Sequence, residues 1–207
     1  MYYLDEDIWF PKVQEATEDG LLAIGGDLSA ERLMHAYRHG IFPWFEERQP
    51  ILWWSPDPRM VLFPNELKIS KSMKQVLRNT SFKITVNHAF NDVIHECSVA
   101  KREGQSGTWI TKEMINAYIG LHELGHAKSV EVWQDKELVG GLYGIDLGDV
   151  FCGESMFSIA SNASKVGFIT YLQNTSYKLI DCQVYTEHLA SLGAREIPRN
   201  EFLNHLT

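Results

Sequence analysis

Three strand-like segments follow one another in the second half of the chain, with only short turns between them. The segments are 130–133, 137–141 and 149–152, and the turns fall at Asp135-Lys136 and at Gly148. Turns this short join antiparallel neighbours, because a parallel connection needs about a dozen residues or more. A helix over 162–172, a strand over 178–184 and a helix over 187–192 ending at Gly193 are predicted next. This order predicts an α+β domain built on a mainly antiparallel sheet.

Helices with recognisable ends precede these strands. Ser70 is placed to cap a helix that runs through Arg78, and Thr111 to cap one that ends at Gly125. The apolar face of this last helix is predicted to hold Met114, Ala117, Tyr118, Leu121 and Leu124. A strand over 82–86 and a helix over 89–102 are predicted between them.

The first 58 residues differ in composition from the rest and are rich in Gly, Pro and Trp. They contain one predicted helix, capped by Ser29 and stopped by Gly40. Pro50, Pro56 and Pro58 interrupt regular structure near Asp57. We therefore expect a small N-terminal domain over 1–58 and a larger domain over 59–207.

Composition excludes several classes of protein. The hydrophobic fraction of 44% and the charged fraction of 22% are those of an ordinary globular protein. No apolar run approaches 18 residues, and the acidic N-terminus does not resemble a signal peptide. The three cysteines are few and widely spaced, which favours free thiols in a reducing cytosol. The expectation is a cytoplasmic protein without a membrane span, and a monomer.

One motif matches a metal site in letters only. His122-Glu123-Leu124-Gly125-His126 fits the His-Glu-x-x-His pattern of zinc proteases. That chemistry needs both imidazoles on one face of a continuous helix. Gly125 stands at the expected helix stop, so we expect His126 to lie beyond the helix and predict no metal site. A nucleophile elbow at Gly153-Glu154-Ser155 is also excluded, since its second glycine is missing.

Several blocks occur together, in one order, over nearly the whole chain. They are 20–28 (GLLAIGGDL), 40–45 (GIFPWF), 52–59 (LWWSPDPR), 107–111 (GTWIT), 121–126 (LHELGH), 151–158 (FCGESMFS), 162–165 (NASK), 180–183 (IDCQ) and 191–194 (SLGA). With these blocks the chain resembles the leucyl/phenylalanyl-tRNA–protein transferase family. The resemblance implies a small N-terminal domain joined to a GNAT-like acyltransferase domain. It also implies transfer of Leu or Phe, and less well Met, from aminoacyl-tRNA to proteins with N-terminal Arg or Lys, which marks them for degradation.

The chemistry of such a transfer requires little activation of the substrates. An aminoacyl ester is already activated, so neither ATP nor a metal is needed and no cofactor is expected. The coenzyme A pyrophosphate loop of GNAT enzymes is absent from the sequence. The site therefore has to align the reactants and handle one proton.

Asp181 and Gln183 suit that task, because residues two apart in a strand point to one face. A carboxylate can orient the carboxamide, whose oxygen can accept a hydrogen bond from the attacking amine. We expect orientation rather than base catalysis from Asp181, since a carboxyl of pKa about 4 is a poor base for an amine. By resemblance the same pair is the proposed proton relay. The resemblance also places Glu154 in the active site, where a loop carboxylate can attract the cationic acceptor. The alternative for Asp181 and Gln183 is a polar pair at a sheet edge, and the alternative for Glu154 is a cap or turn residue.

Donor selection for Leu or Phe calls for an apolar pocket. By resemblance its lining is Trp44, Trp109, Leu142, Phe151, Phe168, Tyr171 and Ile180. Without the resemblance these residues read as ordinary core. Leu142 and Phe168 stand where the family is expected to have Met and Leu, which implies a shifted donor preference.

A basic stretch stands out in a chain of net charge −8. It contains Lys68, Lys71, Lys74 and Arg78. These cations are expected to meet phosphates of the tRNA acceptor arm, which predicts salt-sensitive binding with little dependence on tRNA sequence. The alternative is a solvated helix face.

Three other functions stay open at this point. The first is a GNAT-fold transferase that uses a small acyl donor, and the second is a non-catalytic module that binds tRNA or protein N-termini. The third is a zinc hydrolase, which metal content would test.

Overall fold

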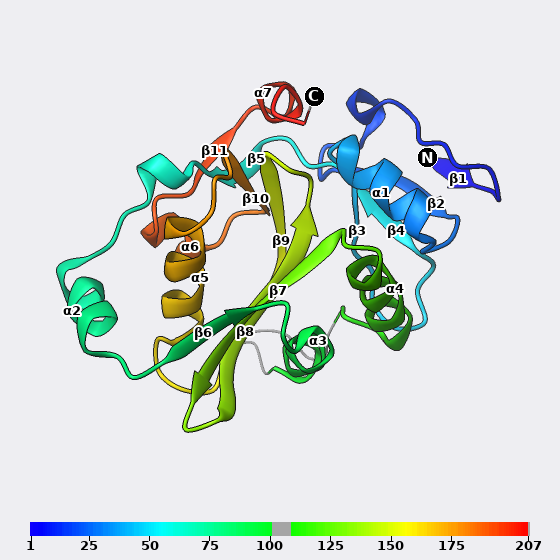
Figure 1. Ribbon diagram of the computed structural model, residues 1–207. Helices are drawn as coiled ribbons and strands as arrows, with labels where there is room; N and C mark the ends of the chain where they lie inside the picture. The colour runs from blue at the N-terminus through cyan, green and yellow to red at the C-terminus, as the bar shows by residue number, and fades with distance from the viewer. Residues whose placement is uncertain (101–108, 207) are drawn as a thin grey trace.

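The computed structural model describes residues 1–100 and 109–206, and their strands form two sheets (Figure 1). The strands are β1 Tyr2–Leu4, β2 Leu21–Gly25, β3 Phe42–Pro43, β4 Leu52–Trp54, β5 Arg59–Leu62, β6 Lys83–Val86, β7 Ala127–Gln134, β8 Glu137–Asp146, β9 Val150–Ser158, β10 Leu179–Gln183 and β11 Arg195–Ile197. The helices are α1 Ala30–Arg38, α2 Lys71–Asn79, α3 Phe90–Val99, α4 Lys112–Glu123, α5 Ala163–Gln173, α6 Glu187–Ser191 and α7 Arg199–Leu203, with 3-10 turns η1 Val13–Glu15 and η2 Pro64–Glu66.

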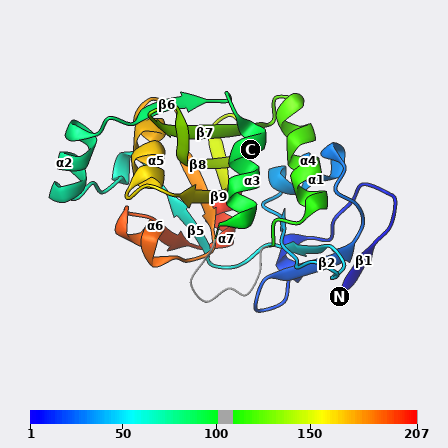
Figure 2. The same ribbon diagram turned by 90° about the horizontal axis from the view of Figure 1, so that it is seen from below.

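The larger sheet has the order β11-β5-β10-β9-β8-β7-β6 and is antiparallel except between β9 and β10. The predicted α+β class with a mainly antiparallel sheet is confirmed. Helix α5 packs on one face of β7, β8 and β9, and α3 packs on the other with α4 beside it (Figures 1 and 2). The central strands are therefore buried on both faces, and besides apolar side chains they bury Ser129, Glu131 and Glu154.

Helix α5 approaches the sheet closely through glycines. A Cβ atom on Gly167 would lie 2.6 Å from Val132, and one on Gly140 would lie 2.7 Å from the Cβ atom of Ala163. Neither position leaves room for a side chain. This close packing fixes the height of α5 over the strands that carry the cavity described below.

The predicted helix caps are confirmed. The side chains of Ser29, Ser70 and Thr111 each accept a hydrogen bond from a backbone N–H three residues later. Gly125 has φ +83° and follows the end of α4. Helix α3 ends at Val99, before the predicted end at Arg102, which lies outside the described residues.

Two other expectations are wrong. Leu124 is 62% exposed, because it lies past the last turn of α4 and leaves the apolar face. The strand predicted to stop at Cys152 continues to Ser158 as β9. Glu154 therefore lies within a strand, not in a loop.

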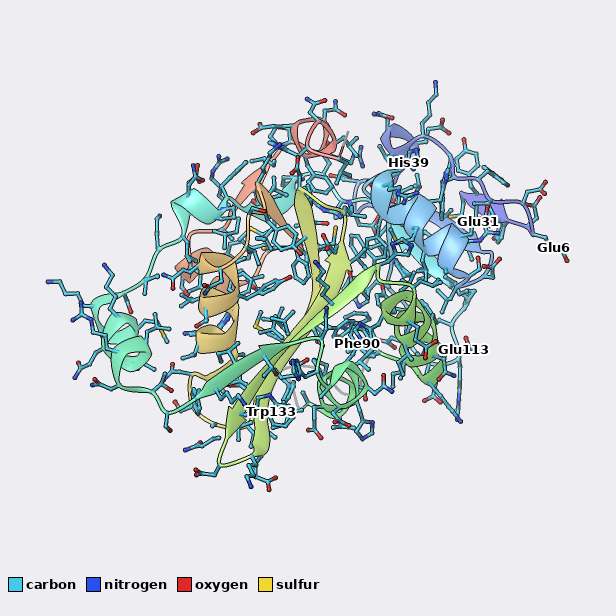
Figure 3. All side chains as sticks on the ribbon, in the orientation of Figure 1. Glu6, Glu31, His39, Phe90, Glu113 and Trp133 are labelled. Atoms are coloured by element: carbon cyan, nitrogen blue, oxygen red, sulfur yellow. The ribbon has the colours of Figure 1, made fainter. Side chains whose placement is uncertain are left out.

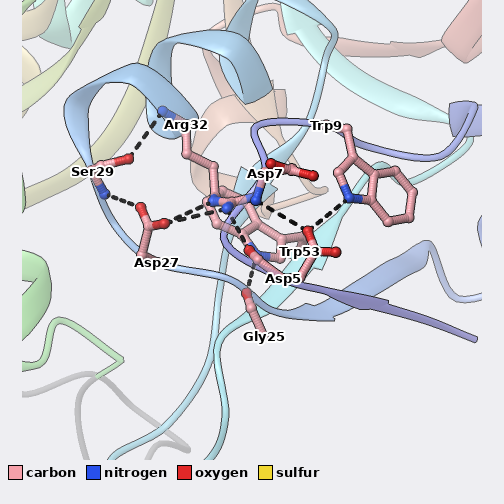
Figure 4. Close-up of polar contacts among 8 residues, drawn as sticks. All are labelled: Asp5, Asp7, Trp9, Gly25, Asp27, Ser29, Arg32 and Trp53. Atoms are coloured by element: carbon pink, nitrogen blue, oxygen red, sulfur yellow. Dashed lines mark hydrogen bonds and ion pairs between the residues drawn. The ribbon is translucent and has the colours of Figure 1, made fainter.

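The smaller sheet, β1-β2-β4-β3, is held to α1 by Arg32 (Figure 4). The buried guanidinium donates to the backbone oxygen of Asp5 (2.7 Å) and pairs with Asp27 (3.2 Å). The indole N–H of buried Trp53 donates to the oxygen of Gly25 (2.8 Å). These bonds tie β1, β2 and β4 to α1, which carries a residue of the site.

The His-Glu-x-x-His segment lies at the end of α4, as the position of Gly125 predicted. The ring of His122 stacks on Phe90 at a centroid distance of 4.3 Å and donates through Nδ1 to the oxygen of Ala127 (2.9 Å). His126 lies beyond the helix. Phe90 lies inside the molecule beneath the sheet, whereas Glu31 and Glu113 point outward (Figure 3).

The longest helix in the described ranges, α4, has 12 residues. None of the described helices has the length and apolar character that crossing a lipid bilayer requires.

Candidate active site

A cavity of about 900 Å³ opens beside the carboxyl-terminal end of β10. Strands β9 and β10 pair in parallel only from Leu179↔Val150 to Asp181↔Cys152. Beyond the last pair β10 ends at Gln183, while β9 continues alongside β8. The two strands therefore part after the last pair, and the residues that follow it line the cavity.

Glu154 occupies a β-bulge in β9. Its neighbours Gly153 and Ser155 pair with Gly144 and Tyr143 on β8, so Glu154 has no residue opposite. The bulge reverses the alternation of side chains. Cys152 and Phe157 are five residues apart and yet pack in the same core cluster. Bulges re-aim side chains in this way, and here the bulge sends a carboxylate inward to line the cavity.

A second bulge lies opposite in β10. Asp181 and Gln183 pair with the consecutive residues Val61 and Met60 of β5, which leaves Cys182 as the extra residue. Gln183 has φ +64°, a left-handed conformation that is rare outside glycine. The predicted alternation is interrupted here, because Ile180, Asp181, Cys182 and Gln183 all line the cavity.

The two bulges bring Gln183 and Glu154 together. The Nε2 atom of Gln183 donates to Oε1 of Glu154 at 2.8 Å. The carboxamide is therefore oriented by Glu154, whereas the sequence argument gave that role to Asp181. Asp181 contacts Gln183 through the backbone, since it accepts the Gln183 N–H at 2.9 Å.

Asp181 is fully buried and paired with Arg59. The guanidinium donates two hydrogen bonds to its carboxylate, at 2.8 and 2.7 Å. It also donates to the oxygen of Gly40 (3.2 Å) and lies over the rings of Phe42 and Phe202. Such a bidentate pair neutralises the carboxylate, so Asp181 lines the cavity as half of an ion pair.

Glu154 is 9% exposed, and within residues 1–100 and 109–206 no basic side chain forms an ion pair with it. Tyr118 donates to its Oε2 atom at 3.1 Å, and Tyr37 is hydrogen-bonded to Tyr118. Burial raises the pKa of Glu154 from 4.5 to about 7, even though its hydrogen bonds with Tyr118 and Gln183 oppose the shift. Glu154 is therefore poised to change charge near neutral pH.

Six of the seven residues predicted for the apolar pocket line the cavity. Leu142, Phe151, Phe168 and Ile180 are buried in its wall, Trp109 is half-buried, and Trp44 is 41% exposed. The seventh, Tyr171, does not line it. Its ring packs behind Phe151 at a centroid distance of 5.5 Å, and it lines a smaller cavity of about 390 Å³.

The four basic residues predicted to bind tRNA lie apart from the cavity. Lys71, Lys74 and Arg78 are exposed on α2, and exposed Lys68 precedes that helix. Helix α2 protrudes at one edge of the molecule in both views (Figures 1 and 2). None of the four lines the cavity.

The sequence argument missed Arg59, Tyr37 and Tyr118. Arg59 was visible as the end of the block LWWSPDPR and as a member of the basic stretch, and the two tyrosines read as apolar positions of helices. Within residues 1–100 and 109–206, no three His, Cys, Asp or Glu side chains are grouped as metal ligands.

Comparison with known families gives two matches. The model described as leucyl/phenylalanyl-tRNA protein transferase matches residues 61–207, and the model for the N-terminal domain of the same protein matches residues 26–57. Proteins named leucyl/phenylalanyl-tRNA–protein transferase are among the relatives. The one from Flavobacterium johnsoniae is 65% identical over 100% of this chain and 99% of its own length. The one from Syntrophus aciditrophicus is 58% identical over 96% of this chain and 84% of its own.

Solved structures resemble the chain more distantly. A conserved protein of unknown function from Staphylococcus epidermidis has a TM-score of 0.49 at 10% identity, covering 86% of this chain and 68% of its own. A GCN5-related N-acetyltransferase from Kribbella flavida has a TM-score of 0.36 at 10% identity, covering 84% and 63%.

Proposed function

The chain belongs to the leucyl/phenylalanyl-tRNA–protein transferase family, and we propose that it carries out the family reaction in the cavity beside β9 and β10. It is an aminoacyltransferase that moves Leu or Phe from aminoacyl-tRNA to proteins. The observation that carries the proposal is the contact between Gln183 and Glu154 at an apolar cavity.

In the reaction, the acceptor α-amine forms a bond to the ester carbonyl carbon, and the bond from that carbon to the ribose oxygen breaks. One proton leaves the amine nitrogen, and the departing ribose oxygen gains one. With its N–H held by Glu154, the carboxamide of Gln183 turns its oxygen away from that carboxylate, free to accept from the amine. Asp181 supports this arrangement by fixing the backbone of Gln183.

The walls of the cavity suit an apolar donor side chain. Leu142, Phe151, Phe168 and Ile180 all belong to the core cluster between α5 and the sheet and provide a rigid surface. We propose Leu and Phe as the donors held there, with Met less well used. One methylene changes binding in such a pocket by only about 1–3 kcal/mol, so shape gives limited selectivity.

We propose proteins with N-terminal Arg or Lys as acceptors. Among the described residues, Glu154 and Glu96 are the acidic side chains that line the cavity besides the paired Asp181. A carboxylate without a counter-ion favours a cationic ligand. The basic residues on and before α2 are proposed to contact tRNA phosphates, outside the cavity.

The remaining proposals concern the whole chain. Residues 1–58 and 59–207 are proposed as its two domains, packed through Arg59 and the tyrosine pair. A cytoplasmic location is proposed because aminoacyl-tRNA is made and used in the cytoplasm. A monomer is also proposed, and size-exclusion chromatography with light scattering tests it.

The test is transfer of radiolabelled Phe from Phe-tRNA to a peptide that begins with Arg, compared with the same peptide beginning with Ala. Labelling of the Arg peptide alone is expected. Bound tRNA with no labelled peptide would instead indicate a non-catalytic binding module. Equal labelling of both peptides would overturn the proposed acceptor.

A further inference from the structure

Two buried tyrosine hydroxyls from distant parts of the chain meet at Glu154. Tyr37 lies on α1 and Tyr118 on α4, and their side chains are 1% and 0% exposed. Their hydroxyl oxygens are hydrogen-bonded, and Tyr118 donates to Oε2 of Glu154 at 3.1 Å. Besides Trp44, which lines the cavity, the first 58 residues therefore also reach Glu154 through this buried pair of hydroxyls.

The direction of these hydrogen bonds follows from the number of protons. A tyrosine hydroxyl has one proton, so Tyr118 accepts from Tyr37 when it donates to Glu154. Burial is the main cause that raises the pKa of both tyrosines well above 10, so both stay protonated at neutral pH. The pair thus presents a fixed donor to Oε2 from two side chains that are buried in the core.

The charge of Glu154 decides which end of the Gln183 carboxamide faces it. A carboxylate only accepts hydrogen bonds, so it binds the amide NH₂ and leaves the amide oxygen for another donor. A protonated carboxyl can donate to that oxygen, and the carboxamide can then turn round. Only the first arrangement offers the amine a hydrogen-bond acceptor.

We propose that Tyr37 and Tyr118 are positioning residues for the transfer reaction, which hold Glu154 as a carboxylate and thereby direct the oxygen of Gln183 toward the attacking amine. This inference rests on the proposed function. It gives the N-terminal segment a role in the chemistry, because Tyr37 acts on Glu154 through Tyr118.

Other ionisable groups also face Glu154 or its partners. Asp181 on β10 raises the pKa of Glu154, and Arg59 on β5 is paired with Asp181. Cys152 lies on the same strand as Glu154, and burial raises the pKa of its thiol well above 9, so it stays neutral. Tyr143 packs against Tyr118 at a centroid distance of 5.6 Å. None of these groups is altered by removing one tyrosine hydroxyl.

The experiment measures single-turnover transfer of Phe to an Arg-peptide from pH 5.5 to 9 in wild type, Tyr118→Phe and Tyr37→Phe. Loss of the Tyr118 donor is expected to move the acid limb of the rate profile upward by about one pH unit, which makes the rate at pH 6 roughly tenfold lower. By pH 9 the rates converge. Tyr37→Phe should also move the acid limb toward higher pH, but by a smaller amount.

Tyr177→Phe is the matched control. It removes a hydroxyl from a second buried pair, in which the hydroxyl oxygens of Tyr171 and Tyr177 lie 3.0 Å apart. This pair does not contact Glu154. Its profile should coincide with that of wild type. The amine of the peptide ionises in the same range, but equally for all four enzymes.

If Tyr118→Phe does not fold, the rate profile of Tyr37→Phe tests the proposal in its place. Tyr37→Phe leaves the Tyr118 donor in place, and its shift alone then supports the proposal. In a Glu154→Gln background, Tyr37→Phe should no longer move the profile. If the rate profiles of Tyr118→Phe and Tyr37→Phe have the same pH dependence as wild type, the inference is overturned, even where the rates are lower at every pH. Failure of the wild type to label the Arg-peptide would instead overturn the proposed function.

Discussion

The amide nitrogen of Gln183 lies 2.8 Å from the carboxylate of Glu154, although their strands have already stopped pairing. Each side chain is placed by a β-bulge, one in β9 and one in β10. In the part of the chain that the structure describes, no cation is paired with this buried carboxylate. Such a group stabilises the folded chain less when it is charged than when it is neutral.

The first prediction concerns the pH dependence of stability. Since the pKa of Glu154 is raised to about 7 in the folded state, the folded chain binds more protons than the unfolded chain between pH 4.5 and 7. Its contribution to the free energy of unfolding therefore falls as pH rises through that window. Glu154→Gln mimics the neutral form and lacks this loss. The free energy of unfolding of the variant minus that of wild type should therefore rise by about 3 kcal/mol from pH 4.5 to pH 8.

Urea unfolding at the two pH values measures this change. Glu123→Gln is the control, because Glu123 is exposed at the end of α4 and its removal should have no pH-dependent effect of this size. A Glu154→Gln effect that is the same at both pH values would show that Glu154 is not a destabilising charge.

The second prediction separates the two carboxylates of the cavity. Asp181→Asn leaves the buried guanidinium of Arg59 without its counter-ion, which should lower the free energy of unfolding by about 3–5 kcal/mol. The exposed pair of Lys178 and Asp149 is the comparison, and Lys178→Ala should change stability by less than about 1 kcal/mol. Similar losses in the two variants, measured by urea unfolding at pH 7, would contradict a structural role for Asp181.

The regular parts of the fold could be predicted from local signals. Ser29, Ser70 and Thr111 marked helix starts, and the sequence Asp135-Lys136 marked the hairpin, where both residues have positive φ. Such signals depend on neighbours in sequence, so one sequence is enough to read them.

The geometry of the site could not be predicted in this way. A bulge needs a partner strand, and nothing in the sequence near Glu154 shows that its neighbours pair with Gly144 and Tyr143. Likewise Tyr37 and Tyr118 are 81 residues apart and occupy ordinary core positions of their helices. The residues that line the cavity were inferred from a family resemblance, while the partners that set their charge and orientation appear only once the chain is folded.

The third prediction concerns donor choice. Phe168→Leu removes volume from the wall of the cavity, so the smaller donor loses more contact than the larger one. The ratio of kcat/KM for Phe-tRNA to that for Leu-tRNA should rise by roughly tenfold. Phe82→Leu is the control, because Phe82 packs in the same core cluster without lining the cavity. An unchanged ratio in Phe168→Leu would remove Phe168 from the donor pocket.

The last prediction concerns the basic residues on α2. Lys71 and Lys74 are exposed and lie outside the cavity, so reversing their charge should spare the chemistry. If both meet phosphates, Lys71→Glu with Lys74→Glu should weaken tRNA binding and flatten the slope of log K against log salt by about 1.5 to 2. The rate at saturating tRNA should not change.

The control changes the net charge equally at other exposed positions, Lys12→Glu with Lys136→Glu. Fluorescence anisotropy with labelled tRNA at several salt concentrations gives the affinity and the slope together. A loss of affinity that is equal in both double variants would reflect net charge alone. A smaller slope confined to the α2 variant would locate the phosphate contacts on that helix. Helix α2 lies at the far edge of the molecule from the N-terminal segment (Figure 1). The acceptor arm of the tRNA would then have to extend from α2 to the cavity.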